Sequence, residues 1–221
     1  MKKNYQLDFQ KVRRKTQIKD INSFNIYLKN IFSDLAKKEV TDKVKGIDKI
    51  AFIKYMNIPF IVGEKLFNVL DINKNGILEN DEFIKGITNL YVGRLEETQK
   101  IIFNLIDFDS DGKIIPEDSR LLIVFIKHLA NPIKGIVKQN ISKPLTDEEH
   151  LDEINNLVRN FFNNKKIMNF EEYKYSIENN NSDVFFIFIC YFYNNKPFCE
   201  NSIKILRLLE KSSQVFSSAN S

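Results

Sequence analysis

Two twelve-residue stretches of the chain carry oxygen-bearing side chains at the spacing that a hard cation requires. In residues 71–82, such side chains stand at positions one, three, five, nine and twelve, and a glycine at position six permits a sharp turn with positive φ. Ca²⁺ takes six to eight oxygen ligands at about 2.3–2.6 Å, and this spacing supplies them. With the backbone carbonyl at position seven, the predicted ligands are Asp71, Asn73, Asn75, Ile77, Glu79 and Glu82.

Residues 107–118 repeat the pattern with more carboxylates and one shorter ligand. Position nine is Ile115, so a water must complete the shell there, and position twelve is aspartate instead of glutamate. Because aspartate is one methylene shorter, the shell falls toward six ligands, which suits Mg²⁺ better than Ca²⁺. We therefore expect the first loop to be the more Ca²⁺-selective one. The predicted ligands of the second loop are Asp107, Asp109, Asp111, the Lys113 carbonyl and Asp118.

Both loops stand between apolar-periodic segments, which predict a helix before and after each. The loops begin 36 residues apart, at Asp71 and Asp107, which indicates an internal repeat. Position eight is apolar in both, as Leu78 and Ile114. We expect these two residues to pair as a short two-stranded ribbon, so that ordering one loop partly orders the other. Strand patterns are otherwise missing, and the predicted fold class is all-α.

These two loops and their flanking helices, over residues 60–129, resemble the EF-hand superfamily. Two weaker copies flank the pair. Residues 40–51 have Ile47 at position eight but no acid at position one and Ala51 at position twelve. Residues 161–172 have Met168 at position eight and Glu172 at position twelve. We expect both copies to act as structural partners without metal.

The second weak copy departs furthest from the ligand pattern. Phe161 stands at position one, Lys165 at position five and Lys166 at position six, and these lysines would repel a cation. The whole resembles a four-hand protein of the calmodulin, recoverin and calcineurin-B type with two competent central hands. The resemblance implies that Ca²⁺ changes the angle between paired helices and exposes an apolar groove, in which an amphipathic helix of a target protein lies.

Composition and charge exclude several classes of protein. The 221 residues carry a net charge of +4, too mild for a dedicated nucleic-acid binder. The longest apolar run, residues 184–193, is about half of a membrane-spanning helix. Two cysteines make no disulfide framework, and no secretory signal follows Met1, so we expect a cytoplasmic protein. No phosphate-cradling loop or nucleophile motif is present, and we expect no enzyme activity.

The predicted organisation has five parts. Residues 1–39 form a basic arm and an amphipathic helix, and the arm is the one place where membrane contact is expected, the alternative being a solvated helix face. Residues 40–130 form the EF-hand domain, 131–145 a linker, 146–211 a C-terminal helical domain that includes the copy at 161–172, and 212–221 a disordered tail. Residues 184–193 are either core or a built-in ligand of a groove in the hands.

The leading functional hypothesis is an intracellular Ca²⁺ sensor or adaptor that recognises a helix of a partner protein. Two alternatives stay open: a constitutive regulatory or structural subunit of an enzyme or motor, and a Ca²⁺/Mg²⁺ buffer. A sensor requires an ion-dependent rise in exposed apolar surface, which a buffer lacks.

Overall fold

The computed structural model describes residues 18, 20–36, 45–129, 147–179, 183–194 and 196–198. The described part of the chain is mostly helical and contains one small two-stranded antiparallel ribbon, as an EF-hand-like all-α fold requires. The predicted basic arm before residue 18, the predicted linker at 131–145 and the predicted tail at 212–221 lie outside the described residues. None of the described helices is long and apolar enough to cross a membrane.

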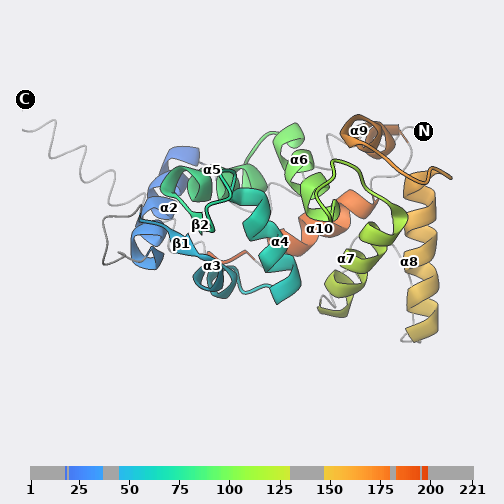
Figure 1. The fold of residues 1–221 in the computed structure, drawn as a ribbon, viewed down its shortest axis with the longest axis horizontal. Helices are drawn as coiled ribbons and strands as arrows, with labels where there is room; N and C mark the ends of the chain where they lie inside the picture. The colour runs from blue at the N-terminus through green and yellow to red at the C-terminus, as the bar shows by residue number, and fades with distance from the viewer. Residues whose placement is uncertain are drawn as a thin grey trace, which may run out of the picture. The chain divides into compact units, whose positions relative to one another are not determined.

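The elements alternate between helices and short loops, with two very short strands (Figure 1). In chain order they are α2 (Ile21–Leu35), β1 (Ile47–Asp48), α3 (Lys49–Met56), α4 (Phe60–Leu70), β2 (Ile77–Leu78), α5 (Asn80–Tyr91), α6 (Leu95–Ile106), α7 (Pro116–Leu129), α8 (Asp147–Phe162), α9 (Phe170–Asn179) and α10 (Asp183–Asn194).

These elements form two compact units. The first-loop unit contains α2 to α5 and the short segment 196–198, and it carries the loop 71–82. The second-loop unit contains α6 to α10 and carries the loop 107–118. The boundary lies between Arg94 and Leu95, inside the region that the sequence assigned to one domain, residues 40–130. The two competent loops are therefore in different units.

The predicted ribbon between Leu78 and Ile114 is wrong. Leu78 pairs instead with Ile47, and Asp48 with Ile77, as the antiparallel strands β1 and β2. Ile114 exchanges both backbone hydrogen bonds with Met168, at 2.8 and 3.0 Å. Each competent loop thus pairs with the nearest weak copy at position eight, because that copy lies in the same compact unit.

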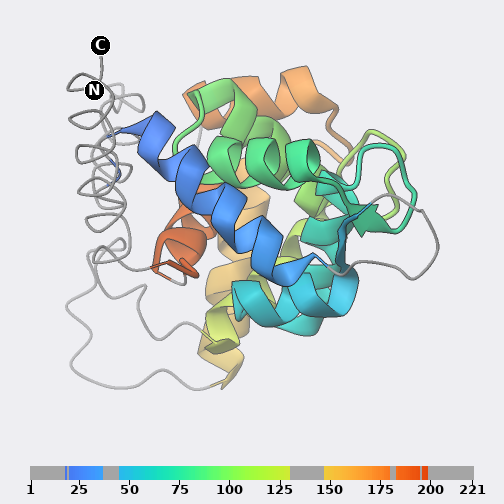
Figure 2. The ribbon, with the colours of Figure 1, turned by 90° about the vertical axis from the view of Figure 1, so that its left-hand side faces the viewer.

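The core of the first-loop unit is built around aromatic side chains that follow the loops. Phe52 comes directly after the loop 40–51 and Phe83 directly after the loop 71–82, and both are fully buried. Phe52 stacks edge-on against Phe67 of α4, and Phe83 lies against Phe32 of α2. The predicted amphipathic helix is α2, which lies along α5 (Figure 2). Its buried apolar residues Phe24, Leu28 and Phe32 recur every four residues, close to the 3.6-residue helical period.

The second-loop unit has α10 as its most apolar element. Every residue from Val184 to Tyr193 is buried. The helix packs against α6, α7 and α8 (Figure 1). A helix that is apolar on all sides is stable only when neighbours surround it, and here they do. Residues 184–193 therefore serve as core of this unit.

Helices α4 and α5 approach each other closely at a glycine. A Cβ added at Gly86 would lie 2.6 Å from Leu70 Cδ2 and 2.9 Å from its Cδ1. Leu70 is buried, so its methyl groups have little room to move. The glycine lets the two helices that flank the loop 71–82 meet.

Gly86→Ala is expected to destabilise the protein. Overpacking a core position costs about 1–3 kcal/mol, whereas alanine in a helix recovers about 1 kcal/mol relative to glycine, so the net effect is a loss. Chemical denaturation measures this loss. Lys85→Ala, at the exposed neighbouring position, is the control and should leave the unfolding midpoint nearly unchanged. A Gly86→Ala variant more stable than the parent would contradict the close packing.

Candidate metal-binding loops

The first residue of each competent loop organises the backbone that follows it. Asp71 Oδ1 accepts a hydrogen bond from the Asn75 amide at 3.2 Å, and Oδ2 accepts one from the Gly76 amide at 3.0 Å. Asp107 does the same for the amides of Asp111 and Gly112, at 3.2 and 3.0 Å. Both aspartates are buried as residues. The two loops therefore have the same local fold.

Glycine at position six is required by this fold. Gly76 has φ of 83° and Gly112 of 84°, in the left-handed region that other residues seldom occupy. At position four, Lys74 and Ser110 also have positive φ, of 58° and 62°. The turn directs the side chains at positions three and five back toward position one.

In the first loop, hydrogen bonds gather the side chains at positions three, five and nine. The side-chain Nδ2 atoms of Asn73 and Asn75 both donate to Glu79 Oε1, at 3.0 and 2.9 Å. Asn75 Oδ1 accepts from the backbone amide of position seven, Ile77, at 3.0 Å. Five predicted ligands of this loop thus lie within one hydrogen-bonded network that starts at Asp71.

The sixth predicted ligand of the first loop, Glu82, also caps the helix α5. Its Oε2 accepts from the Glu79 amide at 3.0 Å, which completes a capping box with Glu79. Its Oε1 accepts from the Ile72 and Asn73 amides at the beginning of the loop, at 2.9 and 3.2 Å. Glu82 therefore links the start of the loop to the first turn of the exiting helix.

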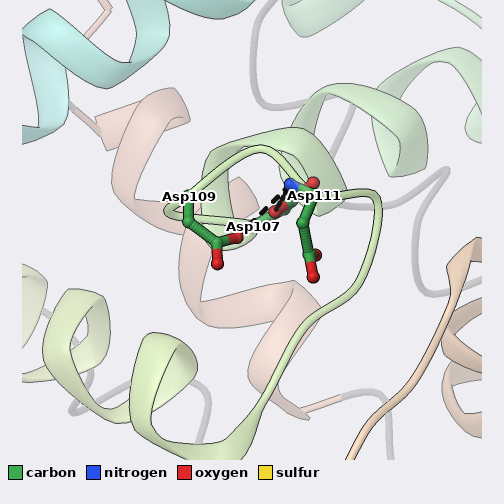
Figure 3. A group of neighbouring side chains, drawn as sticks. All are labelled: Asp107, Asp109 and Asp111. Carbon is green, nitrogen blue, oxygen red and sulfur yellow. Dashed lines mark hydrogen bonds between the residues drawn. The ribbon is translucent and has the colours of Figure 1, made fainter.

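In the second loop, three carboxylates converge. Oxygen atoms of Asp107, Asp109 and Asp111 all lie within 4.8 Å of one another (Figure 3). The backbone is held as in the first loop: Asp111 Oδ1 accepts from the Lys113 amide at 2.8 Å. Three like charges this close repel one another, and a divalent cation relieves the repulsion. The donor set fits a hard cation.

Asp118 lies outside this group of three, but the charges of the group affect its pKa. Its Oδ2 accepts from the Ile115 amide at 3.1 Å, at the beginning of α7. Burial raises the pKa of Asp118 above the usual aspartate value, and the carboxylates of Asp109, Asp107 and Asp111 raise it further. The hydrogen bond from Ile115 acts in the opposite direction. The surroundings of the position-twelve carboxylate therefore disfavour its charged form.

The loop 161–172 contains a cation of its own. Lys165 Nζ lies 2.6 Å from Glu172 Oε1 and forms an ion pair across the loop, from position five to position twelve. Glu172 Oε2 accepts from the Asn169 amide at 3.0 Å. These two bonds hold the pKa of Glu172 below its usual value. The Lys165 ammonium group therefore already pairs with the Glu172 carboxylate, which a metal ion in this loop would need as a ligand.

Position one of that loop is closed as well. Phe161 is fully buried, and its ring lies 5.5 Å from Phe162 and 5.8 Å from Tyr173. The other weak copy, residues 40–51, is described from residue 45 onward, and there Asp48 caps α3 by accepting from the Ala51 amide at 2.8 Å. Its position twelve, Ala51, offers no side-chain oxygen.

Sequence reasoning missed the contribution of position nine to the ends of the loops. Asp48, Glu79 and Asn169 stand at position nine, and each accepts a backbone hydrogen bond from the residue three positions later, at the start of the exiting helix. An oxygen-bearing side chain three residues before the first helical turn is a recognisable N-cap signal.

Comparison with known proteins gives a distant similarity and no family assignment. No protein-family profile matches the chain. The chain is similar to a protein of Dictyostelium discoideum that is described as a recoverin family protein. The two are 27% identical over 165 residues, which cover 70% of this chain and 68% of that protein.

The pKa of Asp118 leads to a pH prediction. Because that pKa is raised in the ion-free fold, protonation begins at a higher pH than for an ordinary aspartate and competes with a cation. We expect the apparent Ca²⁺ or Mg²⁺ affinity of the second loop to be lower at a mildly acidic pH than at neutral pH, because Asp118 starts to be protonated before an ordinary aspartate does. Calorimetric titration at the two pH values measures this. Asp118→Asn should bind more weakly and with less dependence on pH; equal pH dependence in both proteins would contradict the assignment.

Removing the internal cation of the loop 161–172 should not create a metal site. In Lys165→Gln the repulsion is gone, but Phe161 still supplies no oxygen at position one. We expect the number of bound Ca²⁺ ions to be the same in Lys165→Gln as in the parent protein. Equilibrium dialysis with radioactive Ca²⁺ counts them, with Lys166→Gln as a control of equal charge. One additional ion in Lys165→Gln alone would show that the lysine is the sole obstacle.

Proposed function

We propose that this chain is a Ca²⁺ sensor or adaptor of the cytoplasm, which couples ion binding in two loops to recognition of a partner protein. The observation that carries the proposal is the shared fold of the loops 71–82 and 107–118, in which the position-one aspartates accept the amides of positions five and six. The similarity to a recoverin family protein supports the same function.

Each loop takes one cation in this proposal. Ca²⁺ binds the first loop through a ligand set that includes three carboxylates. The capping box places Glu82 where it can supply both of its oxygens. The second loop takes Ca²⁺ or Mg²⁺, with Mg²⁺ favoured by its shorter position-twelve ligand. The bound ligands are the eleven residues that the sequence analysis names. The partner is a protein that presents an amphipathic helix.

A metal in the first loop replaces hydrogen bonds that now involve its ligands. Glu82 Oε1 accepts from the Ile72 and Asn73 amides, and Glu79 Oε1 accepts from two asparagine side chains. A cation competes with these donors for the same oxygens. Because Glu82 is also part of the first turn of α5, a change at its carboxylate acts directly on that helix.

The proposal is tested by ion-dependent exposure of apolar surface. We expect an environment-sensitive dye to bind more strongly with Ca²⁺ than with a chelator. In Glu82→Gln, calorimetry should show the first site weakened by at least about tenfold, since even outer-shell partners of a metal are worth about 10–100-fold in affinity. Asp81→Asn removes the same charge one residue earlier and is the matched control.

Two results would go against this function. Equal dye binding with and without Ca²⁺ would contradict the sensor hypothesis. Unchanged Ca²⁺ affinity in Glu82→Gln would contradict the assignment of Glu82 as a ligand. The two readouts are independent, because the first reports the response of the fold and the second reports the ion.

A second candidate is a constitutive regulatory or structural subunit, or a buffer, in which the ion stabilises the fold. The packing of α10 favours it, because the second-loop unit already covers the residues 184–193 within itself. In this case Ca²⁺ or Mg²⁺ raises the melting temperature without changing dye binding.

A further inference from the structure

The weak copy 40–51 lies against the predicted ion site of the first competent loop along the ribbon of β1 and β2. The antiparallel register pairs Ile47 with Leu78. One residue further in the same register, Gly46 stands opposite Glu79, the predicted ligand at position nine. Gly46 is buried. A residue without any side chain therefore faces a ligand of the neighbouring loop.

The ribbon leaves no room for a side chain on Gly46. An added Cβ would lie 2.8 Å from Ile77 Cδ1 and 3.0 Å from Ile77 Cβ. It would also lie 3.0 Å from the carbonyl oxygen of Leu78, which belongs to the backbone and cannot rotate away. Unlike Gly76, Gly46 does not have a positive φ, so its backbone conformation does not require glycine. The close approach of the two strands does.

The atoms closest to Gly46 belong to residues that hold the predicted ligands together. Ile77 supplies the carbonyl at position seven, and its amide donates to Asn75 Oδ1 at 3.0 Å. Glu79, two residues later, accepts from the side chains of Asn73 and Asn75. A displacement of β2 would therefore act on several predicted ligands at once. Small displacements matter, because the oxygen distances of Ca²⁺ and Mg²⁺ differ by only about 0.3–0.5 Å.

The ribbon of the second-loop unit has the opposite combination of residues. One residue beyond the pair Ile114 and Met168, the antiparallel register sets Ile115 opposite Ile167. Ile115 occupies position nine of its loop and offers no side-chain oxygen, and Ile167 occupies position seven of its weak copy, the equivalent of Gly46. Glycine thus faces the position-nine residue that is a predicted ligand, and isoleucine faces the one that is not.

We propose that Gly46 is a positioning residue for the ion site of the loop 71–82, although it lies in the weak copy. The absence of a side chain lets β1 approach β2 and leaves Ile77 and Glu79 free to take their places as ligands. This inference rests on the proposed function, because it requires that the loop 71–82 binds a cation. The weak copy contributes to ion affinity without supplying a ligand.

Calorimetric titration with Ca²⁺ tests this role in chains that carry Asp109→Asn and Asp111→Asn, which weaken the second loop so that the heat reports the first. We expect Gly46→Ala to weaken binding by about tenfold, at the lower end of the range for partners outside the ligand shell of a metal. Ile50→Ala truncates a side chain that is 75% exposed in the same weak copy, and this uncharged control should bind as the parent does. Adding Ile77→Val to Gly46→Ala removes the Cδ1 atom nearest the new methyl group, so the double variant should bind more tightly than Gly46→Ala alone.

The same titrations separate this inference from the function on which it rests. If Glu82→Gln weakens Ca²⁺ binding and Gly46→Ala does not, the ion site stands and the positioning role is overturned. If neither variant changes binding, the ligand assignment fails and the role of Gly46 fails with it. Loss of the helical signal in ion-free Gly46→Ala would also overturn the proposal, because Gly46 would then be an ordinary packing residue. So would a loss of Ca²⁺ affinity that Ile77→Val does not relieve.

Discussion

Backbone pairing at position eight is the constraint on which both units depend. Leu78 pairs with Ile47 and Ile114 pairs with Met168, so each loop with a full set of oxygen ligands is joined to a loop without one. The partner loops are held by contacts that need no metal: Asp48 caps α3, and Lys165 pairs with Glu172. One half of each ribbon is therefore held by contacts of the protein itself. The sequence suggested that one ribbon between Leu78 and Ile114 couples the two predicted ion sites. The structure does not contain this link, because each ribbon joins one loop with a full set of oxygen ligands to one without it.

The two competent loops reach the same backbone fold with different charge. Both use a position-one aspartate to collect two amides, but the first loop has amide side chains at positions three and five where the second has carboxylates. The first loop compensates internally, because Asn73 and Asn75 donate to Glu79. In the second, the oxygens of Asp107, Asp109 and Asp111 come within 4.8 Å of one another and raise the pKa of Asp118 together with burial. Electrostatic repulsion of this kind favours capture of a divalent cation, and the first loop, with one carboxylate fewer among its predicted ligands, has less of it.

The sequence predicted what local chemistry decides and missed what depends on the choice of partner. The ligand spacing, the two glycines with positive φ and the buried face of α2 follow from residue type and period. The pairing does not, because position eight is apolar in all four loops, as Ile47, Leu78, Ile114 and Met168, and residue type cannot select among them. The position after each loop shows the same limit. It is aromatic in three cases, Phe52, Phe83 and Tyr173, but it is Ser119 in the second competent loop, where the hydroxyl is buried without a hydrogen-bond partner among the described residues. The sequence shows the serine, but it does not show that its hydroxyl is buried without such a partner.

The two units cover their apolar surfaces in physically different ways. In the second-loop unit, α10 buries ten consecutive residues against three helices, and removing such a helix would expose all of them to water at once. In the first-loop unit, the segment 196–198 contributes a single buried ring. Because the free energy of burial grows with apolar area, α10 contributes more to its unit than any single buried ring contributes. An apolar surface that is to be offered to a partner must be uncovered at low cost. On this argument α10 is held as core of the second-loop unit and is poorly suited to release toward a partner.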